Sequence, residues 1–333
     1  MKRYTAACLI VFGAAVVPLL AQSTGESAIR RLDAALDAIL SPDAKIEKVA
    51  GNFRFTEGPV WDRRGGFLLF SDIPSNAIMK LASDGNVSAF RKDIFTGSHP
   101  DGALVGSNGL TLDRQGRLIA AEHGNRRVSR TEKDGAITVL ADRYEGKRLN
   151  SPNDVVVRTN GDVYFTDPPY GLFRSNPPDP AKDPQRELDF NGIYRIRAGK
   201  LELLAKAAMP NGIAFSPDER RLYINNSDAN NKIWFVYDVK FDGTLGEGQV
   251  LYESKDKAAG VPDGLRIDKK GNLWSSGPGG INIISPDGRL LGVVQFPEVP
   301  ANCGWGGADG KTLYVTARTG LYRIRTKVEG IRP

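Results

Sequence analysis

Six oxygen-bearing side chains recur along the chain, each at the start of a short β-rich run. They are Glu57, Asn108, Asn153, Asn211, Asp263 and Asn302. Carboxylate and amide oxygens are the ligands of hard cations, and Ca²⁺ takes about six to eight oxygens in irregular geometry. Zinc would need clustered histidine or cysteine, and the sequence offers little beyond His99, His123 and Cys303. If the six side chains converge, we therefore expect Ca²⁺ or another divalent cation.

The spacing of these six positions indicates a repeat. Their start-to-start intervals are 51, 45, 58, 52 and 39 residues, close to the roughly 40 to 50 residues of a four-stranded propeller blade. Each β-rich run leads to a polar turn, as at 113–116, and then to a second run with aromatics, as at 163–166. No useful helical periodicity follows residue 50. The sequence therefore predicts an all-β domain, a six-bladed β-propeller over residues 51–333.

A propeller would bring the six positions together, because the innermost strand of each blade runs along one central channel. Two neighbouring carboxylates would repel each other unless a cation lay between them. The competing interpretation is that Asn-Gly at 108–109 and 211–212 and Asp-Gly at 263–264 are tight turns. Turns do not explain Glu57. They also do not explain why all six positions lie five residues before the next turn, so the cation site is favoured.

The first 50 residues lie outside the repeat. Met1, Lys2 and Arg3 precede an apolar run that closes at Ala21, the pattern of a cleaved export signal. We therefore expect residues 1–21 to be removed from a periplasmic or secreted protein without stable membrane insertion. In residues 22–50, positions 27–40 fit a short amphipathic helix outside the propeller. The sixth unit shows no obvious fourth strand before Pro333, and residues 45–49 could supply it.

Composition is that of an ordinary globular protein, with 41% apolar and 25% charged residues. Loss of Lys2 and Arg3 with the signal would lower the net charge from +6 to +4. The positive charge is dispersed, which gives no reason to expect nucleic acid, and no protein partner can be inferred. Cys303, the one cysteine left after signal removal, fits a buried small hydrophobe better than a nucleophile.

Five motifs resemble those of the SMP-30/gluconolactonase/luciferin-regenerating family of six-bladed propellers. They are Thr-Glu-Gly-Pro-Val-Trp at 56–61, Ser-Pro-Asn-Asp at 151–154, Phe-Thr-Asp-Pro-Pro-Tyr-Gly at 165–171, Pro-Asn-Gly-Ile-Ala at 210–214 and Pro-Asp-Gly-Leu at 262–265. The resemblance spans about residues 55–324. It implies metal binding by Glu57, Asn211 and Asp263, with Asn153 at or beside the metal. Asn108 and Asn302 have no firm counterpart among the family's ligands, and we expect them either to support the metal ligands from behind or to contact the substrate.

The same resemblance implies hydrolysis of a small-molecule lactone of the sugar type. In this hypothesis calcium polarises the carbonyl and Asp263 activates water, with Asp167 or Asp154 as the reserve base. The segment Glu122–Arg127 is expected to place His123 and Arg126 at the rim of the metal face, and these two residues and Asp167 are candidate substrate contacts. The proline-rich stretch 167–191 is long for a blade loop, and it fits a lid or a solvated insertion equally well.

Two other functions fit the same residues. A phosphotriesterase-type hydrolase would use the same calcium and the same oxygens, because the fold does not fix the substrate. A noncatalytic propeller that binds protein or sugar would need no converging carboxylates. Rates on a lactone panel and on a phosphofluoridate would separate the first alternative, and the effect of calcium on thermal stability would test the second.

Overall fold

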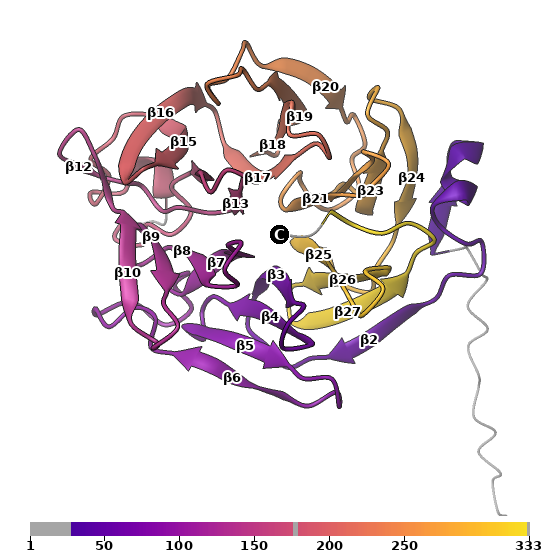
Figure 1. Ribbon diagram of the computed structural model, residues 1–333, viewed down its shortest axis with the longest axis horizontal. Coiled ribbons are helices and arrows are strands. Elements are labelled where there is room, and N and C mark those ends of the chain that lie inside the picture. Colours follow the sequence, from indigo (N-terminus) through magenta and orange to yellow (C-terminus); the bar gives the residue numbers. More distant parts are fainter. Residues whose placement is uncertain (1–27, 176–178, 332–333) are drawn as a thin grey trace, which may run out of the picture.

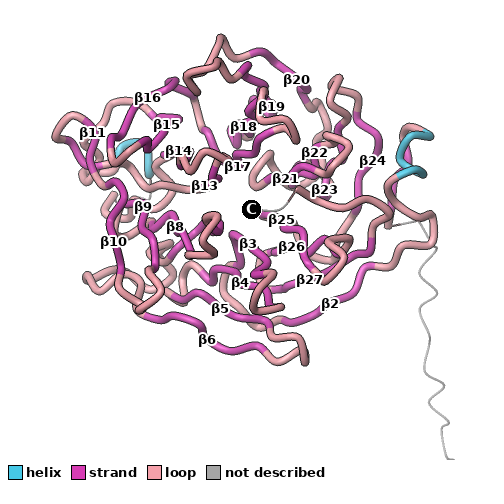
Figure 2. The backbone as a smooth tube through the Cα atoms, in the orientation of Figure 1, coloured by secondary structure: helices cyan, strands magenta, loops and turns pink. Residues whose placement is uncertain are grey.

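The computed structural model describes residues 28–175 and 179–331, which form a six-bladed β-propeller around a central channel (Figure 1). The predicted fold class and blade number are therefore confirmed. Figure 2 shows a chain made almost entirely of strands and loops, with two short helical turns. No helix in the described ranges is long and apolar enough to cross a bilayer. The predicted export signal, residues 1–21, lies outside the described residues.

Blades 1 to 3 follow one another in chain order. Blade 1 contains β3 (Thr56–Asp62), β4 (Phe67–Asp72), β5 (Ala77–Leu81) and β6 (Val87–Lys92). Blade 2 contains β7 (Ser107–Leu112), β8 (Leu118–Glu122), β9 (Arg127–Thr131) and β10 (Ile137–Ala141). A separate hairpin pairs β11 (Arg143–Tyr144) with β12 (Lys147–Arg148). Blade 3 contains β13 (Val155–Val157), β14 (Val163–Asp167), β15 (Asn191–Arg197) and β16 (Lys200–Ala207).

Blades 4 to 6 complete the circle. Blade 4 contains β17 (Pro210–Phe215), β18 (Arg221–Asp228), β19 (Asn231–Asp238) and β20 (Gln249–Glu253). Blade 5 contains β21 (Leu265–Ile267), β22 (Leu273–Gly277), β23 (Gly280–Ile284) and β24 (Leu290–Val294). Blade 6 contains β25 (Asn302–Gly306), β26 (Thr312–Ala317) and β27 (Gly320–Arg325).

The N-terminal strand β2 (Ile46–Ala50) closes the ring as the sequence predicted. It supplies the outer strand of blade 6 by pairing antiparallel to β27, with Ile46 opposite Ile324. The first and last parts of the chain thus share one sheet. Because blade 6 needs β2, the ring cannot open without breaking this sheet.

The amphipathic helix expected over residues 27–40 is not formed, and that prediction is wrong. β1 (Ile29–Arg31) instead pairs with β24 as a fifth strand of blade 5. It is followed by η1 (Ala34–Ala38), a single 3₁₀ helix whose first turn is capped by Asp33. Leu32, which the helical stripe required on the buried face, is 52% exposed. The sheet edge offered backbone hydrogen bonds, and these outweighed a weak local periodicity.

Apolar side chains fill the space between neighbouring blades and make the ring rigid. Between blades 3 and 4, Tyr164 and Ile193 pack against Ile213 and Ile224 in one buried cluster. Dense packing of this kind resists small displacements. The inner strands β3, β7, β13, β17, β21 and β25, which surround the centre of Figure 1, are therefore held in fixed positions around the axis.

Candidate metal centre and active site

The six ring residues, Glu57, Asn108, Asn153, Asn211, Asp263 and Asn302, all lie at or just before the start of an inner strand. Backbone hydrogen bonds join successive starts at one level of the channel. The Gly109 N–H donates to the Asn153 carbonyl at 2.7 Å, and the Gly212 N–H donates to the Asp263 carbonyl at 2.9 Å. Five ring residues are at most 4% exposed, and Asp263 is partly buried. The structure therefore brings the sequence-predicted set together at one mouth of the channel.

The glycines that follow the ring residues exist because neighbouring strands approach too closely for a side chain. A Cβ on Gly264 would lie 1.9 Å from Cγ of Asn302, and one on Gly212 would lie 2.3 Å from the Asp263 carbonyl oxygen. The Asn-Gly pairs at 108–109 and 211–212 lie inside β7 and β17. The tight-turn interpretation of these two pairs is therefore wrong, and close approach of backbones explains them.

Polar side chains on the second strands fix the backbone of the ring residues in the following blade. Ser71 donates to the Asn108 carbonyl at 2.8 Å, and Thr166 donates to the Asn211 carbonyl at 2.6 Å. Asn225 donates in the same way to the Asp263 carbonyl, also at 2.6 Å. Blades 1, 3 and 4 thus each position the ring residue of the next blade. This support makes the site rigid before any ligand binds.

Three of the four ring asparagines have their amide nitrogens bonded to neighbouring side chains, and Asn302 is described below. The Asn108 Nδ2 lies 3.2 Å from Nε2 of His123, and the Asn211 Nδ2 donates to Ser227 at 3.3 Å. The Oδ1 atoms of Asn108 and Asn153 are buried and accept no hydrogen bond within the described part of the chain. A buried acceptor without a partner is costly unless water or an ion satisfies it.

Asn302 differs because both its amide nitrogen and its amide oxygen are hydrogen-bonded within the protein. Its Nδ2 donates to Oε2 of Glu57 at 2.9 Å, and its Oδ1 accepts the N–H of Cys303 at 2.8 Å. The Gly58 N–H donates to the same Oε2 of Glu57 at 2.7 Å. Asn302 therefore holds the Glu57 carboxylate in place while its own oxygen is already used. This arrangement leaves Oε1 of Glu57 as the atom available to a ligand.

The two ring carboxylates carry electrostatic strain. Burial raises the pKa of Glu57 to about 7, the negative charge of Asp154 adds to the rise, and the Gly58 N–H, Asn302 and Arg266 oppose it. Burial also raises the pKa of Asp263 well above its ordinary value, with Glu57 and Asp154 as further causes. Mutual repulsion and lost solvation both disfavour the ionised pair. A cation between them would remove both penalties.

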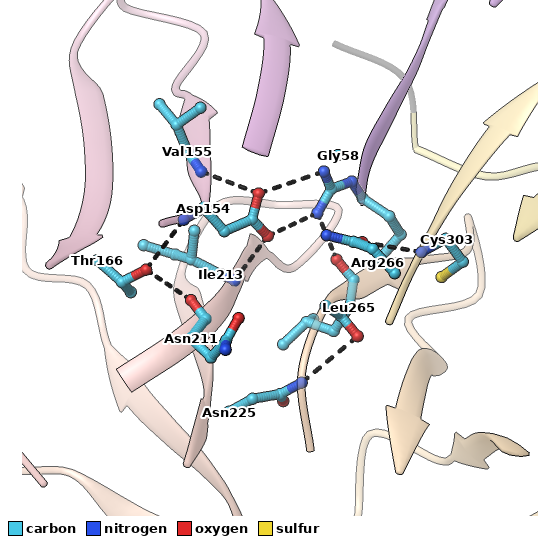
Figure 3. Close-up of polar contacts among 12 residues, drawn as sticks. Gly58, Asp154, Val155, Thr166, Asn211, Ile213, Asn225, Leu265, Arg266 and Cys303 are labelled. Atoms are coloured by element: carbon cyan, nitrogen blue, oxygen red, sulfur yellow. Dashed lines mark hydrogen bonds and ion pairs between the residues drawn. The ribbon is translucent and has the colours of Figure 1, made fainter. Parts of the chain in front are cut away.

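A buried ion pair lies beside the ring carboxylates and was not foreseen as a pair from the sequence. Nη1 of Arg266, in β21, donates to Oδ2 of Asp154 at 2.9 Å, and the Asp154 side chain is fully buried. Figure 3 shows the two groups facing each other with Ile213 alongside. When ionised, three carboxylates (Glu57, Asp154 and Asp263) and this guanidinium sum to a charge of −2.

These features fit a divalent cation held by oxygen. Among the described residues, no three His, Cys, Asp or Glu side chains come together as a metal-binding group, so carboxylates alone would not suffice. A cation bound here would therefore also need amide oxygens, and the Oδ1 atoms of Asn108 and Asn153, which have no partner among the described residues, are of that kind. A mixed carboxylate and amide set with a total charge of −2 suits Ca²⁺.

A family model described as the SMP-30/gluconolactonase/LRE-like region matches residues 55–319. The chain belongs to this family. The family resemblance drawn from the motifs is therefore confirmed, and the match covers all six ring residues.

Similar proteins include lactonases. The chain is 40% identical to a gluconolactonase of Zymomonas mobilis over 316 residues, covering 91% of this chain and 87% of that protein. It is 38% identical to a 6-deoxy-6-sulfogluconolactonase of Pseudomonas putida over 270 residues, covering 78% and 82%. The solved structure of a gluconolactonase from Xanthomonas campestris superimposes with a TM-score of 0.77 at 32% identity, covering 90% and 94%.

In this family member, the two residues expected at a solvent-exposed rim are buried. His123 is fully buried, and burial lowers its pKa to about 4, so the imidazole is neutral at physiological pH. Arg126 is 4% exposed and donates to the backbone carbonyls of Leu149 at 2.7 Å and Gln185 at 2.6 Å. These contacts show that His123 orients Asn108 and that Arg126 anchors loops.

Asp167 lies behind the segment that leads to Asn153. Its Oδ2 accepts the Asn150 N–H at 2.8 Å, and its Oδ1 has no partner among the described residues. Burial raises the pKa of Asp167 to about 7. The carboxyl group therefore positions the approach to Asn153, and its full burial limits direct access by a substrate.

The loop after β14 reaches across neighbouring blades on the metal side. The Tyr170 hydroxyl lies 2.7 Å from Oγ of Ser227, the same atom that receives the Asn211 amide. Phe173 packs edge-on against Phe95, with the two ring centroids 6.1 Å apart. Tyr170 and Ser227 were missed as site residues, although Tyr170 belongs to one of the motifs that indicated the family. Only the fold brings these two side chains from different blades together.

Cys303 has the predicted character of a buried small residue. Its side chain is 0% exposed, and Sγ lies 3.2 Å from the Trp274 carbonyl oxygen. Burial raises the pKa of the thiol to about 12. A thiol that stays protonated and inaccessible is not a nucleophile, so the cysteine contributes to packing next to Asn302.

Proposed function

We propose that this protein hydrolyses a sugar-type lactone at a calcium site formed by Glu57, Asn153, Asn211 and Asp263. The observation that carries the proposal is the buried group of charge −2 beside amide oxygens that lack partners. The lactonases among its relatives support the choice of substrate class. An exported location, from the basic and apolar start of the chain, is part of the same proposal.

A calcium ion bound there would act as a Lewis acid on the lactone carbonyl. Asp263 is the proposed general base, which takes a proton from the attacking water. It is partly buried, whereas Glu57 and Asp154 are at most 1% exposed. A base must reach the water whose proton it removes.

The reserve bases are less suited to the role. Both Asp154 oxygens are occupied, since Oδ1 accepts the Val155 N–H and Oδ2 accepts from Arg266 and from the Ile213 N–H. Asp167 is fully buried behind Asn150. Neither carboxylate can approach a water molecule at the channel mouth without breaking these contacts.

Substrate contacts are proposed from the same geometry. The Asn108 Oδ1 is free to accept a hydrogen bond, and His123 fixes its orientation. Asn302 would affect the substrate indirectly, by holding the Glu57 carboxylate in place. Arg126 and Asp167 would do so by holding the loops that they hydrogen-bond. Tyr170 adds a hydroxyl on the Asn211 side. The hydroxyl groups of a sugar-type lactone could therefore form hydrogen bonds with polar groups on several sides of the proposed calcium site.

Metal analysis combined with a lactone panel tests the proposal. Protein purified without chelator should contain about one calcium per chain, and it should hydrolyse gluconolactone faster than a homoserine lactone or a phosphofluoridate. Chelation should abolish the activity, and added calcium should restore it. Full activity in metal-free protein would overturn the metal assignment, and a faster rate on the phosphofluoridate would overturn the substrate assignment.

A further inference from the structure

Arg266 carries a positive charge into the interior of the propeller, close to the proposed cation site. It lies three residues after Asp263 on the chain, and its guanidinium contacts Asp154 of blade 3 across the channel. Figure 3 shows this pair between the inner strands, with Asn211 from the ring nearby. A permanent cation beside a cation site needs a physical reason, because like charges repel.

The Arg266 guanidinium is held by a carboxylate and by a backbone carbonyl. Nη1 donates to Oδ2 of Asp154 at 2.9 Å and to the Leu265 carbonyl at 2.7 Å. Asp154 is in turn held by the backbone N–H groups of Val155 at 3.0 Å and Ile213 at 3.3 Å. The ion pair therefore links blades 3, 4 and 5. Its charge cannot move away when a metal binds.

We propose that Arg266 sets the charge of the cation site at −2 and thereby makes it selective for a divalent over a trivalent cation. This inference rests on the proposed function. Without Arg266, the carboxylates of Glu57, Asp154 and Asp263 would present a charge of −3. A trivalent ion gains more than a divalent one from each added negative charge, because the Coulomb energy scales with the ion's charge.

Three variants separate charge from structure. Arg266→Met keeps much of the side-chain volume and leaves a charge of −3. Asp154→Asn leaves −1. The double variant Asp154→Asn with Arg266→Met restores −2 without the ion pair, and it is the matched control. Calcium and terbium binding are measured by titration calorimetry on each full-length protein, with circular dichroism to confirm folding.

The expected readout is the ratio of Tb³⁺ to Ca²⁺ affinity. Arg266→Met should raise this ratio by about 10- to 100-fold, the order expected for one unit charge in a partly buried site. The double variant should return it to within about threefold of the wild-type ratio, and Asp154→Asn should lower it. Should Arg266→Met fail to fold, Asp154→Asn and the double variant differ by the same charge, and the double variant should show the higher ratio.

Two outcomes would overturn the inference, and they are distinguishable. If the wild-type protein binds calcium but removing Arg266 leaves the ratio unchanged in both pairs of variants, Arg266 has only a structural role and the proposed function stands. If the wild-type protein binds neither ion, the calcium site itself is wrong and this inference falls with it.

Discussion

The two ends of the central channel are made by the same six inner strands, yet the side chains that line them differ in polarity. At the starts of the strands lie carboxylates and amides such as Glu57 and Asn211. A few residues further along, side chains such as Leu110, Val156 and Phe215 line a cavity of about 200 Å³. Arg266 also lines this cavity, and its pairing with Asp154 puts the ion pair between the two ends.

This difference shows that polar and apolar side chains depend on different kinds of contact with the residues around them. At the metal end, Glu57 and three of the four ring asparagines are hydrogen-bonded to a partner, because a buried polar group without one is costly. At the other end, apolar side chains make up most of the cavity lining, and they need no hydrogen-bond partners. The polar end therefore depends on precise contacts between blades, while the apolar end depends on volume. Changes at the two ends should have separable effects.

The largest expected effect is at the metal end. Asp263→Asn should reduce turnover of a lactone by about 10³-fold or more, because it removes the proposed base and one charge of the cation site. Steady-state rates and calcium titrations on the same preparation measure both losses. Asp84→Asn, at an exposed position in the blade 1 hairpin turn, is the control and should change neither. Wild-type rates in Asp263→Asn would remove this residue from both roles.

A truncation at the apolar end should destabilise the fold and spare the metal. Leu110 is fully buried in a cluster with Val60 and Ile78. Leu110→Ala should lower the free energy of unfolding by about 2–5 kcal/mol, measured by urea denaturation with calcium removed. The calcium affinity of the folded protein should stay within about threefold of wild type. A much larger loss of affinity would show that the two ends are not separable.

Adding one methyl group between blades should disturb the metal end. Gly264→Ala places a Cβ against Asn302, so the Asn302 side chain must move away from Glu57. We expect a loss of about 1–3 kcal/mol in unfolding free energy and weaker calcium binding.

Gly246→Ala is the matched control for Gly264→Ala. Its Cβ would approach nothing closer than 3.6 Å, and it should change stability by less than about 0.5 kcal/mol. Equal effects of the two variants would argue against the close approach of blades at the ring.

The smallest effect concerns pH. Because the pKa of Glu57 is raised from 4.5 to about 7, calcium must displace a proton below neutral pH. Calcium affinity should fall by about tenfold for each unit below pH 7 if one proton is released. In the metal-free protein the native state binds more protons than the unfolded state in this window, so its stability should decrease as pH rises from 4.5 to 7. Titration calorimetry and denaturation between pH 5 and 8 would measure both trends, and a flat calcium affinity would contradict the assignment.

Much of the site could be predicted from the sequence because repeated blades place equivalent positions at equivalent heights. The six ring residues were found from spacing and residue type alone, and the structure brings them together. The roles of individual residues were harder to predict. His123 and Arg126 were expected at the rim, but their contacts lie in the interior, since a loop's residue types do not say which side chain turns inward.

The local sequence determined the strands, the blade repeat, the family motifs and the oxygen-rich starts of the inner strands. Tertiary structure alone decided three things: β1 as a sheet strand instead of part of a helix, the glycines as contact points instead of turns, and the pairing of Asp154 with Arg266. Each of these depends on a partner at least about 100 residues or a whole blade away. Contacts of that kind are set by how blades pack around an axis, which short-range patterns cannot encode.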